Sequence, residues 1–189
     1  MKKTKDHIRL LFIGNSHTYY NDLPYMVSVM VAESGVQADV TMIAHGGWYL
    51  KQHAAEPDVL FNIKYGNYDY VILQEHSHPF DHLDDYEEAL RILTGWIREA
   101  GSVPVIYGTW SMKSQPEKQE VMNQTNRTLS EKLATLYAPV GESWWAYQKN
   151  WPQIEMYDPD GGHASRAGSE FAAKIIWSTI LTDFRKEEE

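Results

Sequence analysis

Two polar stretches near opposite ends of the sequence contain residue types that could act together in catalysis. The first, Gly14–Thr18, places a serine directly after a short apolar run, and the second, Asp160–His163, separates an aspartate from a histidine by two glycines. A serine hydroxyl is a weak nucleophile that needs a base within hydrogen-bond reach, and the base needs a third group to orient it. Ser16, His163 and Asp160 could supply these three functions. Each stretch alone is also ordinary turn chemistry, because glycine, asparagine, serine and aspartate favour turns.

The apolar pattern predicts the elements that would position these stretches. Residues 8–13 are an apolar run too short for a helix and bounded by Gly14 and Asn15, which indicates a buried strand. Similar runs predict further strands at 38–43, 70–73, 103–107 and 139–141. Apolar residues spaced three or four apart predict helices over 23–31, within 48–64, and over 86–100, 116–137 and 166–184. Strands that alternate with helices imply βαβ units and a parallel sheet.

This order of elements predicts where the two polar stretches lie. Both follow the carboxyl ends of strands, which is the edge where open α/β sheets bind their ligands. Pro104 indicates that the fourth strand lies at a sheet edge or begins near the proline. The aromatic segment 144–159 is expected to be a loop. The expected architecture is therefore one α/β domain over residues 1–189, with mobile ends at 1–6 and 185–189.

Composition excludes several classes of protein. The chain has 189 residues, of which 43% are hydrophobic and 23% charged, and these are the values of a globular protein. A net charge of −9 disfavours nucleic-acid binding, which needs clustered Lys and Arg. Cysteine is absent, so disulfides and thiolate metal sites are excluded. No apolar run is long enough to span a membrane and no signal peptide is recognisable, so we expect a cytoplasmic protein.

The two polar stretches, read as Gly-Asn-Ser-His-Thr and Asp-x-x-His, resemble the first and last sequence blocks of the SGNH (GDSL-like) hydrolase family. The order of elements is similar over essentially the whole chain. The resemblance implies a three-layer α/β/α flavodoxin-like sandwich with a five-stranded parallel sheet, and hydrolysis of esters through an acyl-serine intermediate. It implies that Ser16 is the nucleophile, His163 the base and Asp160 the orienting acid. Asn15 stands where the family most often has aspartate.

The resemblance also implies an oxyanion hole of three donors, each of which typically contributes about 10²–10³ in rate. The N–H of Ser16 would be the first donor. A glycine amide after the second strand would be the second, and we favour Gly46 over Gly47. The block after the third strand departs from the family because it contains no asparagine. We expect the side chain of Gln74 to take that place, with His78 as the alternative.

Several residues beside these blocks are expected to contact substrate, because exposed aromatic rings in loops suit flat sugar faces or acyl groups. They are His17, Gly47, Trp48, His78 and Trp110. The expected substrate is a small-molecule acyl ester, with an acetylated sugar as the leading candidate. The serine chemistry requires no metal or organic cofactor. The oligomeric state does not follow from the sequence.

Two other functions are consistent with the sequence. The missing asparagine and the aromatic loops would also suit a carbohydrate-binding protein with weak catalysis, because a fold does not determine a function. Alternatively, His76, His78 and His82 could bind zinc in a metal-assisted hydrolase. Eight histidines in a chain of 189 residues also cluster by chance, which disfavours the metal site.

Overall fold

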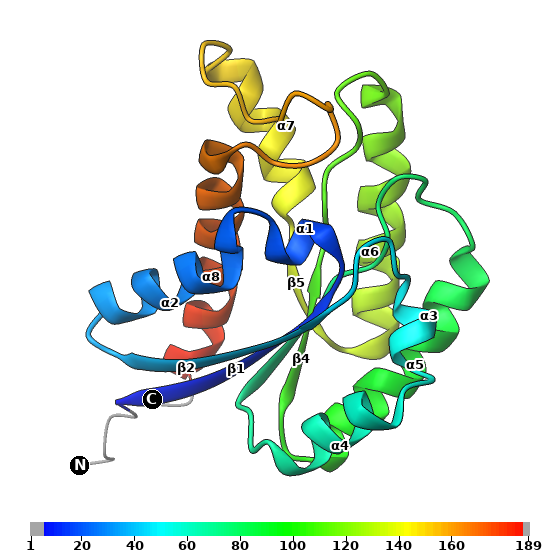
Figure 1. Ribbon diagram of the computed structural model, residues 1–189, viewed down its shortest axis with the longest axis vertical. Coiled ribbons are helices and arrows are strands. Elements are labelled where there is room, and N and C mark those ends of the chain that lie inside the picture. Colours follow the sequence, from blue (N-terminus) through cyan, green and yellow to red (C-terminus); the bar gives the residue numbers. More distant parts are fainter. Residues whose placement is uncertain (1–5, 187–189) are drawn as a thin grey trace.

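The structure is a computed structural model that describes residues 6–186. Its sheet has five strands in the order β2-β1-β3-β4-β5, and all neighbouring strands are parallel. The strands are β1 (His7–Gly14), β2 (Gln37–Ala44), β3 (Tyr70–Leu73), β4 (Val103–Tyr107) and β5 (Leu136–Ala138) (Figure 1). The predicted terminal segments 1–6 and 185–189 lie largely outside the described residues.

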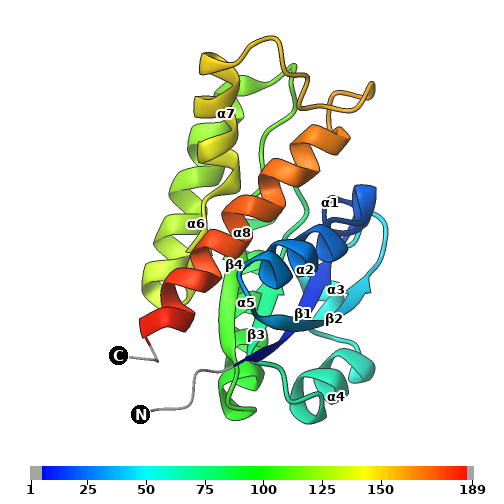
Figure 2. The same cartoon turned by 90° about the vertical axis from the view of Figure 1, so that its left-hand side faces the viewer.

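Helices cover both faces of this sheet. One face carries α2 (Leu23–Glu33), α7 (Val140–Asn150) and α8 (Arg166–Lys186), and α2 and α8 lie in front of the sheet in Figure 2. The opposite face carries α3 (Leu50–His53), α4 (Pro57–Tyr65), α5 (Leu83–Glu99) and α6 (Gln119–Leu133). The short α1 (Ser16–Tyr19) and two 3-10 turns, η1 (Tyr20–Asp22) and η2 (Pro116–Lys118), complete the described chain. The predicted three-layer α/β/α class is confirmed.

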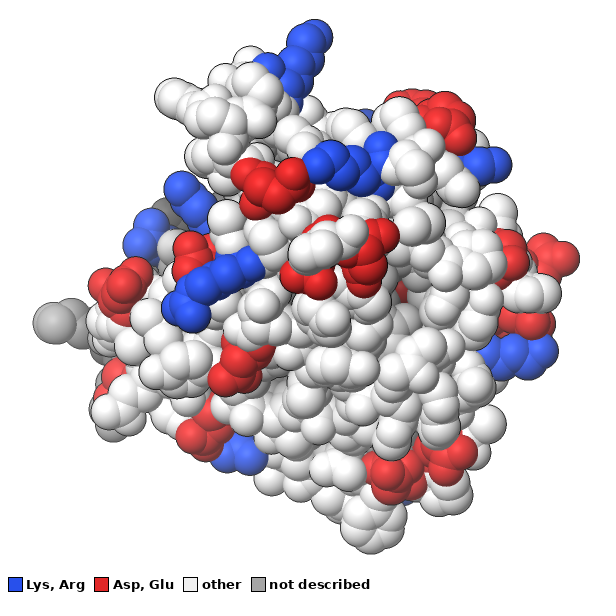
Figure 3. Space-filling model, turned by 45° about the horizontal axis from the view of Figure 1, so that its top comes forward, with Lys and Arg blue, Asp and Glu red and all other residues white. Residues whose placement is uncertain are grey.

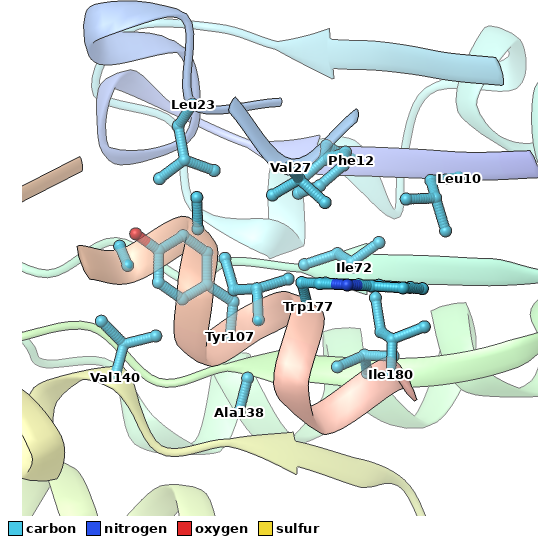
Figure 4. Packing of buried hydrophobic residues seen from close by; sticks show 14 of the residues in the cluster. Leu10, Phe12, Leu23, Val27, Ile72, Tyr107, Ala138, Val140, Trp177 and Ile180 are labelled. Carbon is cyan, nitrogen blue, oxygen red and sulfur yellow. The ribbon is translucent and has the colours of Figure 1, made fainter. Parts of the chain in front are cut away.

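The central strand β1 is buried on both faces, which explains its continuous apolar run. Side chains alternate between the two faces of a strand. Leu10 and Phe12 therefore pack with α2 and α8 in one core, and Leu11 and Ile13 pack with α4 and α5 in the other. Figure 4 shows the first core, where side chains from α2 and α8 meet those of β1 and β3. Burial on both sides fixes the position of β1 and hence of the turn that follows it.

The main difference from the predicted elements lies between residues 133 and 150. The segment predicted as a loop begins as helix α7, because Val140 and Trp144 stand one helical turn apart and bury their side chains. This burial compensates for the modest helix propensity of aromatic residues. The predicted helix over 116–137 ends at Leu133, where Ala134 adopts a left-handed φ of 50°, and β5 begins three residues earlier than predicted.

Pro104 is compatible with an interior strand. The strand β4 lies between β3 and β5, which excludes the first of the two predicted alternatives, an edge strand, and confirms the second, because Pro104 is the second residue of the strand. Pairing with β5 begins only at Val105. The missing N–H of the proline therefore precedes that ladder and interrupts no hydrogen bond in it.

Among the described residues, no helix combines the length and the apolar character that crossing a bilayer requires.

Close packing at Gly168 sets the start of α8 against the segment that leads into the Asp160–His163 stretch. A Cβ atom at residue 168 would lie 2.2 Å from the carbonyl oxygen of Met156 and 2.5 Å from the ring of Trp144. Both neighbours are buried, and one of the two contacts is to backbone. Only glycine therefore permits this approach without a shift of the helix.

Replacing Gly168 with alanine is expected to lower the free energy of unfolding by about 1–3 kcal/mol, because the added methyl group forces the backbone apart. Gly95→Ala is the matched control, since residue 95 lies within α5 and its Cβ would meet no atom within 4 Å. That variant is expected to gain roughly 0.5–1 kcal/mol from helix propensity. Urea unfolding measures both changes. Equal effects of the two substitutions would contradict the close packing.

Candidate active site

The turn after β1 presents Ser16 at the carboxyl edge of the sheet. Asn15 caps α1: its side-chain oxygen accepts the N–H of His17 at 3.1 Å, and its carbonyl accepts the N–H of Thr18 at 2.9 Å. The Asn15 amide nitrogen donates to the carbonyl of Trp48 at 2.9 Å. Asn15 therefore both shapes the serine turn and ties it to the loop after β2.

The Asp160–His163 stretch is a tight turn that an isolated antiparallel bridge between Tyr157 and Ala164 closes, and helix α8 begins just after it. The Asp160 Oδ1 atom accepts the backbone N–H groups of Gly162 and His163 at 2.8 and 2.9 Å. Gly161 has a φ of +71°, a left-handed conformation that suits glycine. These contacts hold the carboxylate and the imidazole on the same side of the turn.

The structure brings the three predicted catalytic residues into one line of hydrogen bonds. The Oδ2 atom of Asp160 lies 2.5 Å from Nδ1 of His163, and Nε2 of His163 lies 2.7 Å from Oγ of Ser16. The ring of Tyr20 stacks on the His163 ring at 4.2 Å. Sequence reasoning missed Tyr20, and no feature of its surroundings distinguishes it from its neighbour Tyr19.

The charge state of Asp160 determines which nitrogen of His163 carries the proton. Burial raises the pKa of the Asp160 carboxyl, but hydrogen bonds from the His163 ring and from two backbone N–H groups outweigh it and lower the pKa to about 2. Asp160 is therefore ionised at neutral pH and accepts the Nδ1–H of His163. The lone pair on Nε2 is then free to accept the Ser16 hydroxyl proton.

Two backbone N–H groups in the turns after β1 and β2 have no protein acceptor among the described residues. Within the described residues, neither the N–H of Ser16 nor that of Gly46 makes a hydrogen bond. Gly46 stands in the loop after β2, where the N–H of Trp48 donates to the carbonyl of His45 at 3.1 Å and Gly47 has a φ of +74°. Unpaired N–H groups of this kind can bind a negatively charged oxygen.

The side chain of Gln74, predicted as an oxyanion donor, packs against the serine turn. Its side chain is 1% exposed, and its Oε1 atom accepts the N–H of Asn15 and the hydroxyl of Thr18, both at 2.8 Å. Its amide nitrogen donates to the carbonyl of Glu75. The amide oxygen is thus engaged in the serine turn, and one N–H of the amide nitrogen is engaged in the loop after β3.

The predicted substrate contact of Trp110 is wrong. Its side chain is fully buried, stacks on Trp144 at 4.0 Å and donates from Nε1 to the carbonyl of Gly162 at 2.8 Å. Trp110 therefore supports the turn that carries His163 from the buried side, through its hydrogen bond to the preceding residue. The residue follows β4 in the sequence, and its position in a loop gave no signal of burial.

The other residues predicted to contact substrate differ in how exposed they are. Gly47 is exposed and Trp48 is half-buried, whereas His17 is 7% exposed. His78 is half-buried, donates from Nε2 to the carbonyl of Trp110 at 2.9 Å, and lines a cavity of about 480 Å³. Contact of these four residues with substrate stays a prediction.

Two histidines next to His163 are held neutral by their surroundings. Burial lowers the pKa of His17 well below its usual value, and the nearby rings of His78 and His163 lower it further. Burial likewise lowers the pKa of His78, and the other histidines add to the effect. Their rings lie close together, with His17 at 4.9 Å from His78 and 5.1 Å from His163. Neutral neighbours reduce the electrostatic cost of a positive charge on His163.

The predicted alternative of a zinc site is not supported by these rings. Nδ1 of His76 donates to the carbonyl of Pro79 at 2.9 Å, and Nε2 of His78 donates to that of Trp110. His82 is exposed and lies near Asp81. In the part of the chain that is described, no three histidine or carboxylate side chains are arranged to bind a metal ion.

The face near the strand ends shows no dominant charge. Figure 3 brings the top of Figure 1 forward, and acidic and basic side chains are scattered across it with uncharged surface between them. A continuous patch of one sign would attract ligands of the opposite charge. This face offers no such patch.

Comparison with known proteins identifies the fold. No protein-family model and no curated protein matches the chain. A solved structure of a protein from Slackia heliotrinireducens, assigned to the SGNH hydrolases, is 27% identical and superposes with a TM-score of 0.79 over 92% of this chain and 99% of that one. A carbohydrate esterase of family 3 from Talaromyces cellulolyticus is 13% identical, with a TM-score of 0.74 over 95% of this chain and 99% of its own. An acetyl xylan esterase is 16% identical, with a TM-score of 0.71 over 92% and 100%.

A buried carboxyl, that of Glu75, stands beside this site. Burial raises its pKa to about 7, and the nearby carboxylates of Asp81 and Asp85 add to this, whereas hydrogen bonds from the N–H groups of His76 and Leu50 lower it. Because the folded pKa exceeds the ordinary value of 4.5, the folded chain binds a proton that the unfolded chain releases between these pH values. Glu75 lines a second cavity, of about 240 Å³, whose other lining residues are Tyr49, Lys51, Gln52, His82, Asp85 and Tyr86.

We expect the free energy of unfolding to fall as pH rises from about 4.5 to about 7, and this part of the fall to be absent in Glu75→Gln. Glutamine has the shape of the protonated acid but cannot ionise. Unfolding in urea at about pH 5 and about pH 8 measures the difference. Glu88→Gln, at an exposed position of α5, should keep the pH dependence of the native chain. The same slope in both variants would contradict the assignment.

Proposed function

We propose that this chain, which is an SGNH-type (GDSL-like) hydrolase, is a serine esterase that removes a small acyl group from an alcohol oxygen. The observation that carries the proposal is the line of contacts from Asp160 through His163 to Ser16, at 2.5 and 2.7 Å. A serine oriented by a histidine and an aspartate is the arrangement that activates a hydroxyl as a nucleophile.

The proposed reaction proceeds in two halves. Oγ of Ser16 attacks the carbonyl carbon of the ester while its proton passes to Nε2 of His163. The bond between that carbon and the alcohol oxygen then breaks, and His163 returns the proton to the leaving oxygen. A water molecule attacks the acyl-serine with His163 again as base, and the carboxylic acid leaves as Ser16 is restored.

The negative oxygen of each tetrahedral intermediate would be bound by the backbone N–H groups of Ser16 and Gly46. Both N–H groups lack a protein acceptor within the described residues, so binding the oxygen breaks no existing hydrogen bond. Donors that are fixed before the reaction lower the barrier because they need no reorganisation in the transition state.

An acetylated carbohydrate is the proposed class of substrate. Two of the similar solved structures are a carbohydrate esterase and an acetyl xylan esterase. The half-buried ring of Trp48, two residues from Gly46, is of the apolar kind that sugars stack against, and the ring of His45 lies 4.1 Å from it. The absence of a continuous charged patch on the face in Figure 3 fits an uncharged ester.

Ser16→Ala should reduce the hydrolysis of p-nitrophenyl acetate by at least about 10³-fold, because the nucleophile is lost. Acetate release from acetylated xylan measures the same loss on a carbohydrate. Ser28→Ala is the matched control. Among the described residues the Ser28 hydroxyl donates only to the carbonyl of Tyr25 on α2, and the rate of this variant should equal that of the native chain. Saturable sugar binding without turnover of any ester would contradict the esterase proposal and would indicate a carbohydrate-binding protein.

Asp160→Asn should reduce kcat by about 10⁴-fold with little change in KM. Because Oδ1 accepts two backbone N–H groups, the amide would turn its NH2 toward Nδ1 of His163. The proton of the imidazole would then move to Nε2, which could no longer accept the proton of Ser16. Asp158→Asn, in the same loop but outside this line of contacts, should stay within about twofold of the native rate. Near-native turnover of Asp160→Asn would exclude the proposed role of Asp160.

A further inference from the structure

We propose that Gln74 and Glu75 are positioning residues that hold the two backbone segments of the oxyanion hole at a fixed separation. The inference rests on the proposed function. The block after β3 would thus act on the reaction through the main chain of its neighbours and not through a side-chain donor of its own.

The first half of this pair fixes the serine turn. The Gln74 oxygen accepts the N–H of Asn15, the residue directly before Ser16, and also the hydroxyl of Thr18, two residues after it. Both hydrogen bonds are buried, where a hydrogen bond is strong and an unpaired partner is costly. The turn carrying the N–H of Ser16 is therefore clamped on both sides by one amide oxygen.

Gly14 provides the space that this contact needs. A Cβ atom at residue 14 would lie 2.5 Å from Oε1 of Gln74 and 2.4 Å from Oγ1 of Thr18. The absence of a side chain at the end of β1 therefore allows the polar end of β3 to reach the serine turn directly.

The second half fixes the loop that carries Gly46. Oε2 of Glu75 accepts the N–H of Leu50 at 3.2 Å, at the point where this loop enters α3. Its Oε1 atom accepts the N–H of His76 at 2.7 Å, and the side chain is 4% exposed. Asn15 joins the two halves, because its amide nitrogen donates to the carbonyl of Trp48 within the same loop.

These contacts matter for the reaction because oxyanion donors act only at the correct distance. A displacement of the order of 1 Å near reacting atoms can cost about 10²-fold in rate. Gln74 is joined to the segment of Ser16, and Glu75 to the segment of Gly46. Since the two are consecutive residues of one buried strand end, a shift of either segment strains the other.

A matched pair of glutamines separates positioning from simple stabilisation. Gln119 is also buried, and its Oε1 atom accepts the backbone N–H of Ser111 at 2.7 Å. Gln119 makes no hydrogen bond to the serine turn or to the loop after β2. Gln74→Met and Gln119→Met therefore remove equivalent buried acceptors, one beside the proposed oxyanion hole and one away from it.

We expect Gln74→Met to lower kcat for p-nitrophenyl acetate by about 10–10²-fold with KM changed by less than about threefold. The inhibition constant of a boronic acid, whose serine adduct is tetrahedral, should rise by the same factor. Gln119→Met should lose comparable stability in urea but keep kcat within about twofold. Equal values of kcat for the two variants would overturn the positioning role. Thr18→Val, which removes one of the two hydrogen bonds to Gln74, is the milder variant if Gln74→Met does not fold, and it should lower kcat several-fold.

The rate of Ser16 labelling by a fluorophosphonate distinguishes the two proposals without relying on a substrate. Labelling forms a bond from Oγ to phosphorus and releases fluoride, and mass spectrometry locates the adduct. If Ser16 of the native chain is not labelled, the proposed function fails and the positioning role fails with it. If the native chain is labelled and Gln74→Met is labelled equally fast, only the positioning role is overturned. The positioning role is supported if Gln74→Met is labelled more slowly than the native chain and Gln119→Met is not.

Discussion

The missing side chain at Gly14 is the constraint on which the active site depends. Because no Cβ stands there, Gln74 reaches past the end of β1 and accepts the N–H of Asn15. The same turn then presents Ser16 within 2.7 Å of His163. A glycine in this position is therefore a packing requirement between two strands, although from the sequence alone it resembles an ordinary turn residue.

The electrostatics around the imidazole of His163 depend on one ionised carboxylate and on the burial of two neighbouring histidines. Asp160 is ionised and lies on one side, and its charge is shared among three hydrogen bonds. The neighbouring rings of His17 and His78 are kept neutral because ionising them would require a charge in a buried environment. One ionised carboxylate therefore contacts the imidazole of His163 and its two neighbouring histidines carry no charge, and this favours the transient charge that a general base must carry.

The parts of the molecule that obey strong local rules could be predicted from the sequence. The strands are continuous apolar runs and the Asp-x-x-His spacing is compact, so the sheet and the approach of Ser16 to His163 both followed from the pattern. The remainder depended on partners distant in the sequence. Trp144 lies in a helix because its side chain is buried there. Trp110 is buried because its ring stacks on Trp144 and its Nε1 donates to the carbonyl of Gly162. Gln74 carries an amide that suits an oxyanion donor, and only the positions of Asn15 and Thr18 show that its oxygen holds the serine turn.

The two residues that meet at the active site are 147 positions apart in the chain, Ser16 on the turn after the first strand and His163 just before the last helix. During synthesis the ribosome would release Ser16 early, but its partner emerges only when most of the sheet can already form. Loop closure over so many residues is entropically costly and tends to come late in folding. A nascent or truncated chain would therefore carry an inert serine, and reactivity would arise only with completion of the fold.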